Sequence, residues 1–230
     1  MAEFHFVEDY ERHVADLIAK HPIDEAMSLA VGGDYEGIGR VMAQALITAG
    51  LKDGDSVVDI GCGSGRVASA VAKRVNLGAY LGTDVVEALL SYARTKCPDY
   101  YNFVNNRQLY IPIESDSVDY VFAFSLFTHL LPEECYMYLR DAYRVLKPGG
   151  LFLFTYHDIS NPEHRSVFHM NVRALEANQQ QHLNSFINME MIDFWISLTG
   201  FVKDDRPLQQ GWQSSILLRK PGMHTQKSRA

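Results

Sequence analysis

The sequence predicts an α/β protein built on a doubly wound, mostly parallel β-sheet, and two features of its hydrophobic pattern lead to this prediction. From Ser56 onward, short apolar runs alternate with helix-length amphipathic stretches. The runs are continuously apolar, as expected for strands that are covered on both faces. Short connections between strands and helices favour right-handed crossovers and parallel central strands. The predicted strands are 57–60, 79–82, 103–104, 118–124, 151–156, 201–203 and 214–218.

Two helical stretches precede the first strand and predict an N-terminal helical cap over residues 1–50. Apolar residues recur at helical spacing over 6–18, and the His-Pro pair at 21–22 ends that stretch. A second apolar face runs over 38–46, with Gly50 at the position of a C-terminal stop. The Val-Gly-Gly-Asp-Tyr segment 31–35 between them is predicted to be a loop.

The rest of the chain is predicted to form one main domain over 51–220, with a tail at 221–230. A helix begins at Pro132 and runs to Leu146, and the sequence Lys-Pro-Gly-Gly then turns the chain into the next strand. Residues 157–185 are polar and too long for an ordinary connection, so we expect an insertion after the fifth strand that forms a substrate lid. The alternative is a disordered or oligomer-forming insertion. A helix follows over 189–198 and stops at Gly200.

Composition narrows the class of protein. The chain has 230 residues and a net charge of −7, which argues against a nucleic-acid-binding surface. No apolar run approaches the ~20 residues that cross a bilayer, so no membrane contact is expected. The three cysteines have no metal-ligand spacing and fit free thiols in a reducing compartment, while the acidic N-terminus is unlike a signal peptide. These features predict a cytoplasmic protein.

The segment after the first strand carries the strongest functional signal. Gly61, Gly63 and Gly65 alternate there, which allows a sharp turn and a close approach of the backbone to a ligand. Dinucleotide-binding domains also have such a loop, but their fingerprint needs a small residue where this chain has Arg66. Asp59 ends the first strand, where a pyrophosphate would gain nothing from negative charge. A sulfonium cofactor with an α-amino group is cationic and suits that carboxylate.

The second strand ends at another carboxylate, Asp84. A carboxylate at this point can accept hydrogen bonds from both ribose hydroxyls of a nucleoside. It could also be a helix N-cap. Together with the glycine loop, the position of Asp84 favours ribose binding, although it does not separate the two cofactor classes.

With these residues in hand, the chain resembles the class I S-adenosylmethionine-dependent methyltransferases, small-molecule type, a family with a seven-stranded Rossmann-like fold. The resemblance covers roughly 29–218 and rests on four motifs in the family's order. The motifs are 58–66 (Val-Asp-Ile-Gly-Cys-Gly-Ser-Gly-Arg), 81–84 (Leu-Gly-Thr-Asp), 112–124, and 144–150 (Arg-Val-Leu-Lys-Pro-Gly-Gly).

The resemblance implies S-adenosylmethionine as the cofactor and assigns roles by position. Asp59 and the loop at Gly61 and Gly63 would hold the methionine amino group, and Asp84 the ribose. Val85 would pack on the adenine. The residues that we expect around the adenine amine and the methyl group are Asn105 or Asn106, with the choice between them open, and Ser125 at the end of the fourth strand.

A narrower similarity involves segments 31–35 and 125–129, which together look like a subset of bacterial small-molecule methyltransferases. It implies that the N-terminal loop folds back over the cofactor, with Tyr35 or Arg40 near the methionine carboxylate. The implied partner is a small-molecule methyl acceptor. The oligomeric state stays open, with a homodimer as one alternative.

Methyl transfer is an in-line displacement, so positioning can supply much of the rate. His129 is the first candidate for a general base, because it follows the fourth strand and has a suitable ordinary pKa. The alternative is a histidine packed at the start of the next helix. Tyr156 and His157 are second candidates. No metal is expected, because Ser125 stands where metal-dependent relatives place an acid.

Two other functions remain open at this stage. A nicotinamide-dependent oxidoreductase would use a similar glycine loop, but Arg66 and Asp59 both count against it. A non-catalytic S-adenosylmethionine-binding protein would share every cofactor motif with an enzyme. The leading hypothesis is methyl transfer to oxygen or nitrogen of a small molecule.

Overall fold

The computed structural model describes residues 7–178, 184–206, 208 and 212–222, and a single seven-stranded sheet organises them. The strand order is β3-β2-β1-β4-β5-β7-β6. Strands β1 to β5 are parallel, while β7 runs antiparallel to β5 and to β6. The doubly wound, mostly parallel sheet is therefore confirmed. The strands are β1 (Ser56–Ile60), β2 (Ala79–Asp84), β3 (Asn102–Asn105), β4 (Val118–Ala123), β5 (Leu146–Tyr156), β6 (Val202–Lys203) and β7 (Ser214–Arg219).

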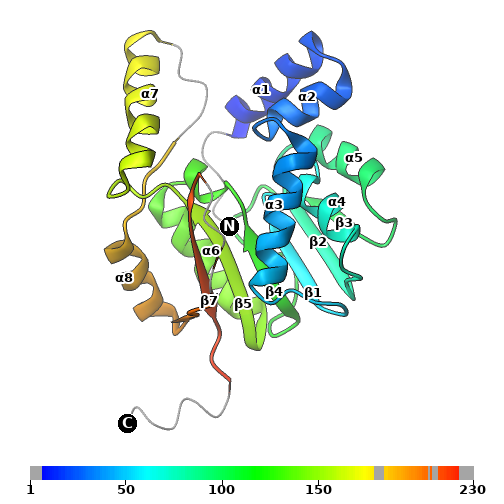
Figure 1. The fold of residues 1–230 in the computed structure, drawn as a ribbon, viewed down its shortest axis with the longest axis vertical. Helices are drawn as coiled ribbons and strands as arrows, with labels where there is room; N and C mark the ends of the chain where they lie inside the picture. The colour runs from blue at the N-terminus through cyan, green and yellow to red at the C-terminus, as the bar shows by residue number, and fades with distance from the viewer. Residues whose placement is uncertain (1–6, 179–183, 207, 209–211, 223–230) are drawn as a thin grey trace.

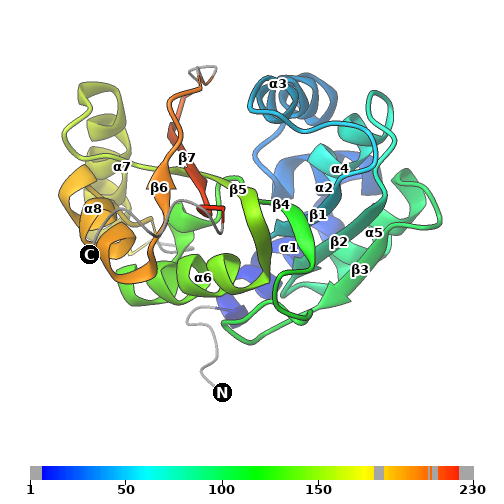
Figure 2. The same cartoon turned by 90° about the horizontal axis from the view of Figure 1, so that it is seen from below.

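Helices cover both faces of the sheet. Figure 2 shows α3 and α4 on one side and α6 and α8 on the other. No helix within the described residues is long and apolar enough to cross a membrane. The helices are α1 (Val7–Lys20), α2 (Ile23–Ala30), α3 (Tyr35–Thr48), α4 (Arg66–Ala72), α5 (Glu87–Lys96), α6 (Pro132–Val145), α7 (Arg165–Glu176) and α8 (Met189–Thr199), with short 3₁₀ turns η1 (Phe127–His129) and η2 (Pro162–His164).

Strand alternation divides the core into two layers. In β5, Leu151 and Leu153 join the cluster formed with α3, α4 and α5, while Phe152 and Phe154 join the cluster formed with α6 and α8. Successive residues of a strand point to opposite faces, so a sheet covered on both faces needs apolar side chains at every position. This requirement explains why the strands could be recognised as continuous apolar runs.

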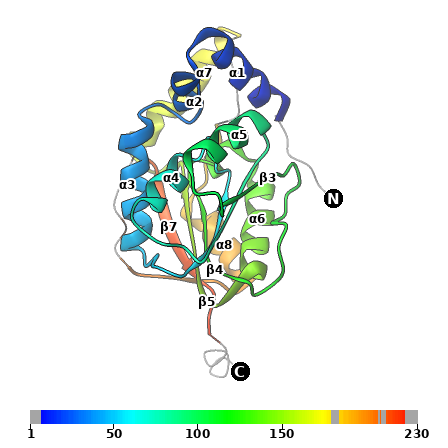
Figure 3. The ribbon, with the colours of Figure 1, turned by 90° about the vertical axis from the view of Figure 1, so that its right-hand side faces the viewer.

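The strand order reverses between β1 and β4, and ligands of open α/β sheets bind at the carboxyl ends beside such a point. Figures 1 and 3 show α1, α2 and α7 gathered beyond that end of the sheet. The opposite end is held by polar contacts. Asp119 accepts hydrogen bonds from the Ser56 N–H (2.9 Å) and from Lys147 Nζ (2.9 Å), which ties β4 to β1 and β5.

The structure differs from the sequence-based expectations at three places: one helix was missed, one predicted boundary shifts, and the insertion contains helices. Residues 23–30 form α2, a helix of only eight residues that gave no extended periodic signal. The helix that begins at Pro132 ends at Val145, and residues 146–150 already belong to β5. Residues 157–185 contain η2 and α7, so this insertion has helical structure over much of its described length.

Candidate functional site

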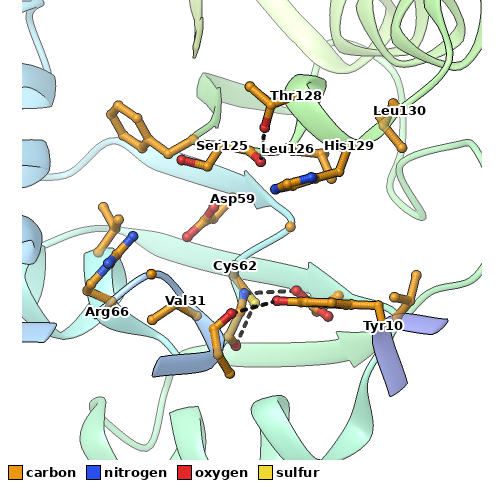
Figure 4. Close-up of a pocket in the computed structure, with 18 of the residues that line it drawn as sticks. Tyr10, Val31, Asp59, Cys62, Arg66, Ser125, Leu126, Thr128, His129 and Leu130 are labelled. Carbon is orange, nitrogen blue, oxygen red and sulfur yellow. Dashed lines mark hydrogen bonds between the residues drawn. The ribbon is translucent and has the colours of Figure 1, made fainter. Parts of the chain in front are cut away.

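A cavity of about 430 Å³ opens at the carboxyl ends of the strands, where the strand order reverses. Its walls come from the glycine loop after β1, the ends of β2 and β4, helix α1, and the segments around 157, 184 and 213. Figure 4 shows Val31, Cys62 and Arg66 along one side of the cavity, and along the other Ser125, Leu126, Thr128, His129 and Leu130. Chain segments far apart in sequence therefore converge on one partly open cavity.

Asp59 is the most perturbed acid of the cavity wall. Its carboxylate is 2% exposed and accepts a hydrogen bond from the Tyr80 hydroxyl (2.7 Å). Burial raises the pKa of Asp59 to about 8, against the lowering effect of that hydrogen bond, and the nearby carboxylate of Asp84 raises it further. Within the described residues Asp59 has no ion pair. A cationic ligand would relieve this buried acid.

The glycine loop brings its backbone close to neighbouring chain. Gly63 has a φ of +54°, and a Cβ at this position would lie 2.7 Å from Val31 Cγ1. Both the left-handed conformation and the close approach require glycine here. Gly61, with a φ of +72°, lines the cavity beside Gly63.

Asp84 lies at the end of β2 and faces the same cavity. Its two oxygens accept from the backbone N–H groups of Gly63 (2.9 Å) and Val86 (3.0 Å). Burial raises the pKa of Asp84, while these N–H donors act in the opposite direction. Since the bond to Gly63 holds the glycine loop, Asp84 is more than the helix cap that the sequence left open.

The two asparagines expected near the adenine differ in their position relative to the cavity. Asn106 is 8% exposed and lines the cavity, as does Val85. Asn105 is exposed, and its side-chain amide donates to the Val85 carbonyl (3.1 Å). Asn105 therefore lies outside the wall and Asn106 within it, where the Asn106 side chain donates to the Tyr110 carbonyl (2.7 Å) and accepts from the Gln108 N–H (3.2 Å).

Arg66 is a cavity residue that the sequence argument used only to discriminate between cofactors. It begins α4, is 7% exposed, and its Nη1 donates to the Gly33 carbonyl (3.1 Å). Burial lowers the pKa of this guanidinium. Its place in the wall depends on the loop 31–34 folding back over α4, and the similarity of segment 31–35 implied such a fold-back without indicating a contact with Arg66.

The two residues expected near the methionine carboxylate do not line the cavity. The Tyr35 hydroxyl donates to the Ser64 carbonyl (2.9 Å), so it supports the glycine loop from outside. Arg40 is exposed on α3. Helix α1 instead supplies Tyr10, whose hydroxyl donates to the Ala30 carbonyl (3.1 Å) and whose ring lines the cavity. That contribution was missed because α1 is far from the motifs in sequence.

Ser125 follows β4 in a left-handed conformation, with a φ of +56°, which is uncommon for a residue with a side chain. The Ser125 N–H donates to Thr155 Oγ1 (2.7 Å). The hydroxyls of Ser125 and Thr155 both donate to Gln213 Oε1, at 3.1 Å and 2.7 Å. This network joins the ends of β4, β5 and β7. Gln213 had no sequence signal because β7 reaches the site by antiparallel pairing.

His129 ends the short turn η1, and Figure 4 shows its ring directed into the cavity between Ser125 and Asp59. The adjacent Thr128 is fully buried and donates to the Ser125 carbonyl (2.8 Å). The chain around Ser185 crosses behind this turn, where the Ser185 N–H donates to the Thr128 carbonyl (2.8 Å). The first candidate base thus lies on a well-braced part of the wall.

Tyr156 and His157, the second candidates for the general base, point in different directions. His157 is 8% exposed and lines the cavity. Tyr156 is 2% exposed and packs in the core cluster beside α6 and α8, so it is not a wall residue. Within the described residues, no group of three or more His, Cys, Asp or Glu side chains is arranged to hold a metal ion.

Fold and cavity together give a Rossmann-like domain with a cavity at the switch point of its sheet, the place where open α/β sheets bind their ligands. Residues 57–150 match the family model described as a methyltransferase domain. Over these residues the chain contains a methyltransferase domain, and the matched family together with a neighbour solved with bound S-adenosylmethionine supports S-adenosylmethionine as the cofactor of that domain.

Curated relatives share the domain with this chain. Malonyl-[acyl-carrier protein] O-methyltransferase of Methylococcus capsulatus is 26% identical over 170 residues, which cover 71% of this chain and 59% of that protein. Sterol 24-C-methyltransferase of Saccharomyces cerevisiae is 32% identical over 129 residues, which cover 52% of this chain and 33% of that protein. The chain therefore spans about a third to three fifths of the length of these relatives.

Solved structures share the fold over most of the chain. A methyltransferase of Haloferax volcanii, solved with the Trm112 methyltransferase activator, has a TM-score of 0.66 at 17% identity and covers 96% of this chain and 99% of its own. Magnesium protoporphyrin IX methyltransferase of Synechocystis PCC 6803, solved with bound S-adenosylmethionine, has a TM-score of 0.62 at 12% identity and covers 93% and 94%. These similarities concern the fold.

Proposed function

We propose that this chain transfers the methyl group of S-adenosylmethionine to an oxygen or nitrogen atom of a small-molecule acceptor. The observation that carries the proposal is Asp59, a buried cavity acid whose pKa is raised to about 8. An ammonium group beside it would favour the ionised form and offset the burial penalty. When bound there, the cofactor supplies an electrophilic methyl group.

The other charged wall residues fit the remaining parts of the same cofactor. Arg66 is the cation placed to pair with the methionine carboxylate, since an amino-acid group carries both charges. Asp84 has a lone pair left on each oxygen for the ribose hydroxyls. Val85 directly follows β2 and Asn106 directly follows β3, and both residues line the cavity, where they would contact the adenine.

The acceptor would occupy the β4–β5 side, next to Ser125 and His129. In-line displacement needs the nucleophile, the methyl carbon and sulfur in a row, and effective-molarity estimates assign ~7–11 kcal/mol to such positioning. His129 is placed to take a proton from a protic nucleophile, as its direction into the cavity suggests. We keep residues 1–50 as the cap, 51–220 as the methyltransferase domain and 157–185 as the substrate lid of this proposal.

Calorimetry with S-adenosylmethionine, S-adenosylhomocysteine and NAD tests the cofactor half of the proposal. We expect the two sulfur nucleosides to bind and NAD not to bind. Tight NAD binding without sulfonium binding would show an oxidoreductase instead. Formation of S-adenosylhomocysteine with added small molecules tests catalysis, and binding without turnover across a broad acceptor panel would indicate a non-catalytic protein.

Arg66→Gln tests the carboxylate contact. We compare S-adenosylmethionine with decarboxylated S-adenosylmethionine, which keeps the ammonium and sulfonium groups. The wild type should prefer the intact cofactor by about tenfold or more, as expected for a charge-assisted hydrogen bond. The variant should bind the two equally. A preference that survives in Arg66→Gln places the carboxylate elsewhere.

A further inference from the structure

The cavity wall contains a buried polar atom that has no hydrogen-bond partner among the described residues. His157 follows β5 directly, is 8% exposed and lines the cavity. Its Nδ1 is buried and makes no hydrogen bond within the described part of the chain. Buried polar atoms of native proteins are almost always hydrogen-bonded, and an orphan in a cavity wall is a place where a ligand can supply the missing partner.

The His157 ring is held in place by its surroundings. The Ile187 N–H donates to the His157 carbonyl (2.8 Å), which fixes the backbone. The ring packs against Phe186, with centroids 5.6 Å apart, and against His164 at 5.5 Å. His164 Nδ1 is already used, since it accepts from the Asp158 N–H (2.8 Å). The His157 ring is therefore held in one position, while His157 Nδ1 remains available to a ligand.

The imidazole of His157 is neutral at physiological pH. Burial lowers the pKa of His157 to about 4, and the neighbouring rings of His164 and His129 lower it further. A neutral imidazole carries one N–H donor and one lone pair. A hydroxyl can complement either tautomer, because it can both donate and accept, and an N–H group can donate to the tautomer whose Nδ1 carries the lone pair.

The cavity wall around His157 contains no Asp, Glu, Lys or Arg side chain among the described residues. On the β4–β5–β7 side the charged types Asp, Glu, Lys and Arg are absent, whereas Asp59, Asp84 and Arg66 line the β1–β2 side. A charged acceptor would lose its hydration without gaining a counter-ion there. The residues of this side are Phe124, Ser125, Leu126, Thr128, His129, Leu130, Tyr138, His157, Asn184, Trp212 and Gln213.

We propose, on the basis of the methyl transfer proposed above, that His157 hydrogen-bonds the reacting hydroxyl or N–H of an uncharged acceptor with an apolar body. The lone pair of that oxygen or nitrogen forms the new bond to the methyl carbon. The carbon–sulfur bond breaks with its electron pair left on sulfur, and the proton of the acceptor group passes to His129, the base proposed above, and from there to solvent. His157 thereby selects protic, neutral nucleophiles over carboxylates and over hydrocarbons.

Four probes that share one ring system test this selection. They are 1-naphthol, 1-naphthylamine, 1-naphthoate and naphthalene, and they differ only in the group presented to His157. Imidazole ¹⁵N spectra of the protein saturated with S-adenosylhomocysteine report on each one. We expect naphthol and naphthylamine to shift the His157 Nδ1 resonance, and naphthoate and naphthalene to leave it unchanged. Failure of all four probes to shift it, or an equal effect of naphthoate, overturns the proposal.

Turnover of 1-naphthol or 1-naphthylamine provides the second readout. His157→Phe should lower kcat/KM by about tenfold or more, the loss expected for one buried hydrogen bond. His157→Gln restores a hydrogen-bonding group and should recover part of the kcat/KM that is lost in His157→Phe. His169→Phe is the matched control, because His169 is exposed on α7 and does not line the cavity.

The two proposals fail differently. Unchanged turnover in His157→Phe, with S-adenosylhomocysteine still bound, refutes the role of His157 alone. Loss of S-adenosylhomocysteine binding by the wild type refutes the methyltransferase function itself. Calorimetry on the wild type, His157→Phe and His169→Phe separates these outcomes, and all three should bind S-adenosylhomocysteine equally.

Discussion

Replacement of Asp59 by asparagine keeps the shape of the side chain and removes the charge that we propose for binding the cofactor ammonium group. The Tyr80 hydroxyl can still donate to the remaining carbonyl oxygen, as it does to Asp59 Oδ2 at 2.7 Å. The variant therefore isolates the effect of charge from the effect of packing. Stability and cofactor affinity should change in opposite directions.

The stability of the ligand-free protein should rise in Asp59→Asn. The pKa of Asp59 is raised from 3.8 to about 8 by folding, so the folded state keeps a proton that the unfolded state loses as pH increases. The contribution of Asp59 to stability therefore falls from about pH 4 to about pH 8. Neutral pH lies about three pH units above the unfolded-state pKa of 3.8. The loss of folding free energy caused by Asp59 at this pH is therefore at most ~4 kcal/mol. Asparagine has no such titration.

Cofactor affinity should fall in the same variant. A charge-assisted hydrogen bond contributes ~1.5–3 kcal/mol, which is roughly 10- to 150-fold in the dissociation constant. Because ligand-free Asp59 is mostly protonated below its pKa of about 8, binding of an ammonium group must release a proton. Calorimetry near pH 6.5, in buffers of different ionisation enthalpy, should detect up to about one proton released by the wild type and none by Asp59→Asn.

The control carboxylate is Asp55, which is 8% exposed at the start of β1, outside the cavity. Asp55→Asn should leave affinity and proton release unchanged. Methylthioadenosine, which lacks the amino-acid group, should bind the wild type and Asp59→Asn alike. Wild-type affinity for S-adenosylmethionine in Asp59→Asn, or a variant no more stable than the wild type at pH 7–8, would refute the reasoning.

Three further substitutions address other parts of the cavity. Asp84→Ala should weaken the binding of S-adenosylmethionine and of methylthioadenosine by several-fold or more in calorimetry, because both molecules carry the ribose. Unchanged affinity would mean that Asp84 has a structural role only. Gly63→Ala should lower the melting temperature more than Gly54→Ala, since both glycines have positive φ but only the first would meet a side chain, that of Val31; equal shifts would contradict the packing argument. His129→Gln should reduce turnover by ~10²-fold or more with cofactor affinity unchanged, and full turnover would remove it as a base.

Local patterns were sufficient to predict the sheet and the glycine loop. The strands are buried on both faces, so their runs were visible without any tertiary information. The turn after β1 needs its glycines for backbone geometry that is specified locally. Asp59 and Asp84 end neighbouring parallel strands, so the topology alone places them on the same edge.

Side-chain direction was the part that local patterns could not supply. Alternation in β5 puts residues 152, 154 and 156 in the cluster beside α6 and α8, and therefore turns His157 toward the cavity. Choosing between Tyr156 and His157 required knowing which face of β5 that cluster covers. Arg66 and Tyr10 are wall residues only because α1 and the loop 31–34 fold back over the sheet, a tertiary event without a sequence period.

The cavity separates its two proposed tasks between different elements of the fold. The charged side depends on β1, β2 and α4, whereas the neutral side is built by β4, β5, β7 and the segment around Asn184. That segment is bonded to the backbone of Thr128 and His157, and Asn184 exchanges hydrogen bonds with Asn171 of α7. The proposed lid is therefore connected by hydrogen bonds to the wall that would contact the acceptor. Substitutions on α7 can reach the acceptor through Asn184 while the glycine loop, and with it the methyl donor, stays unchanged.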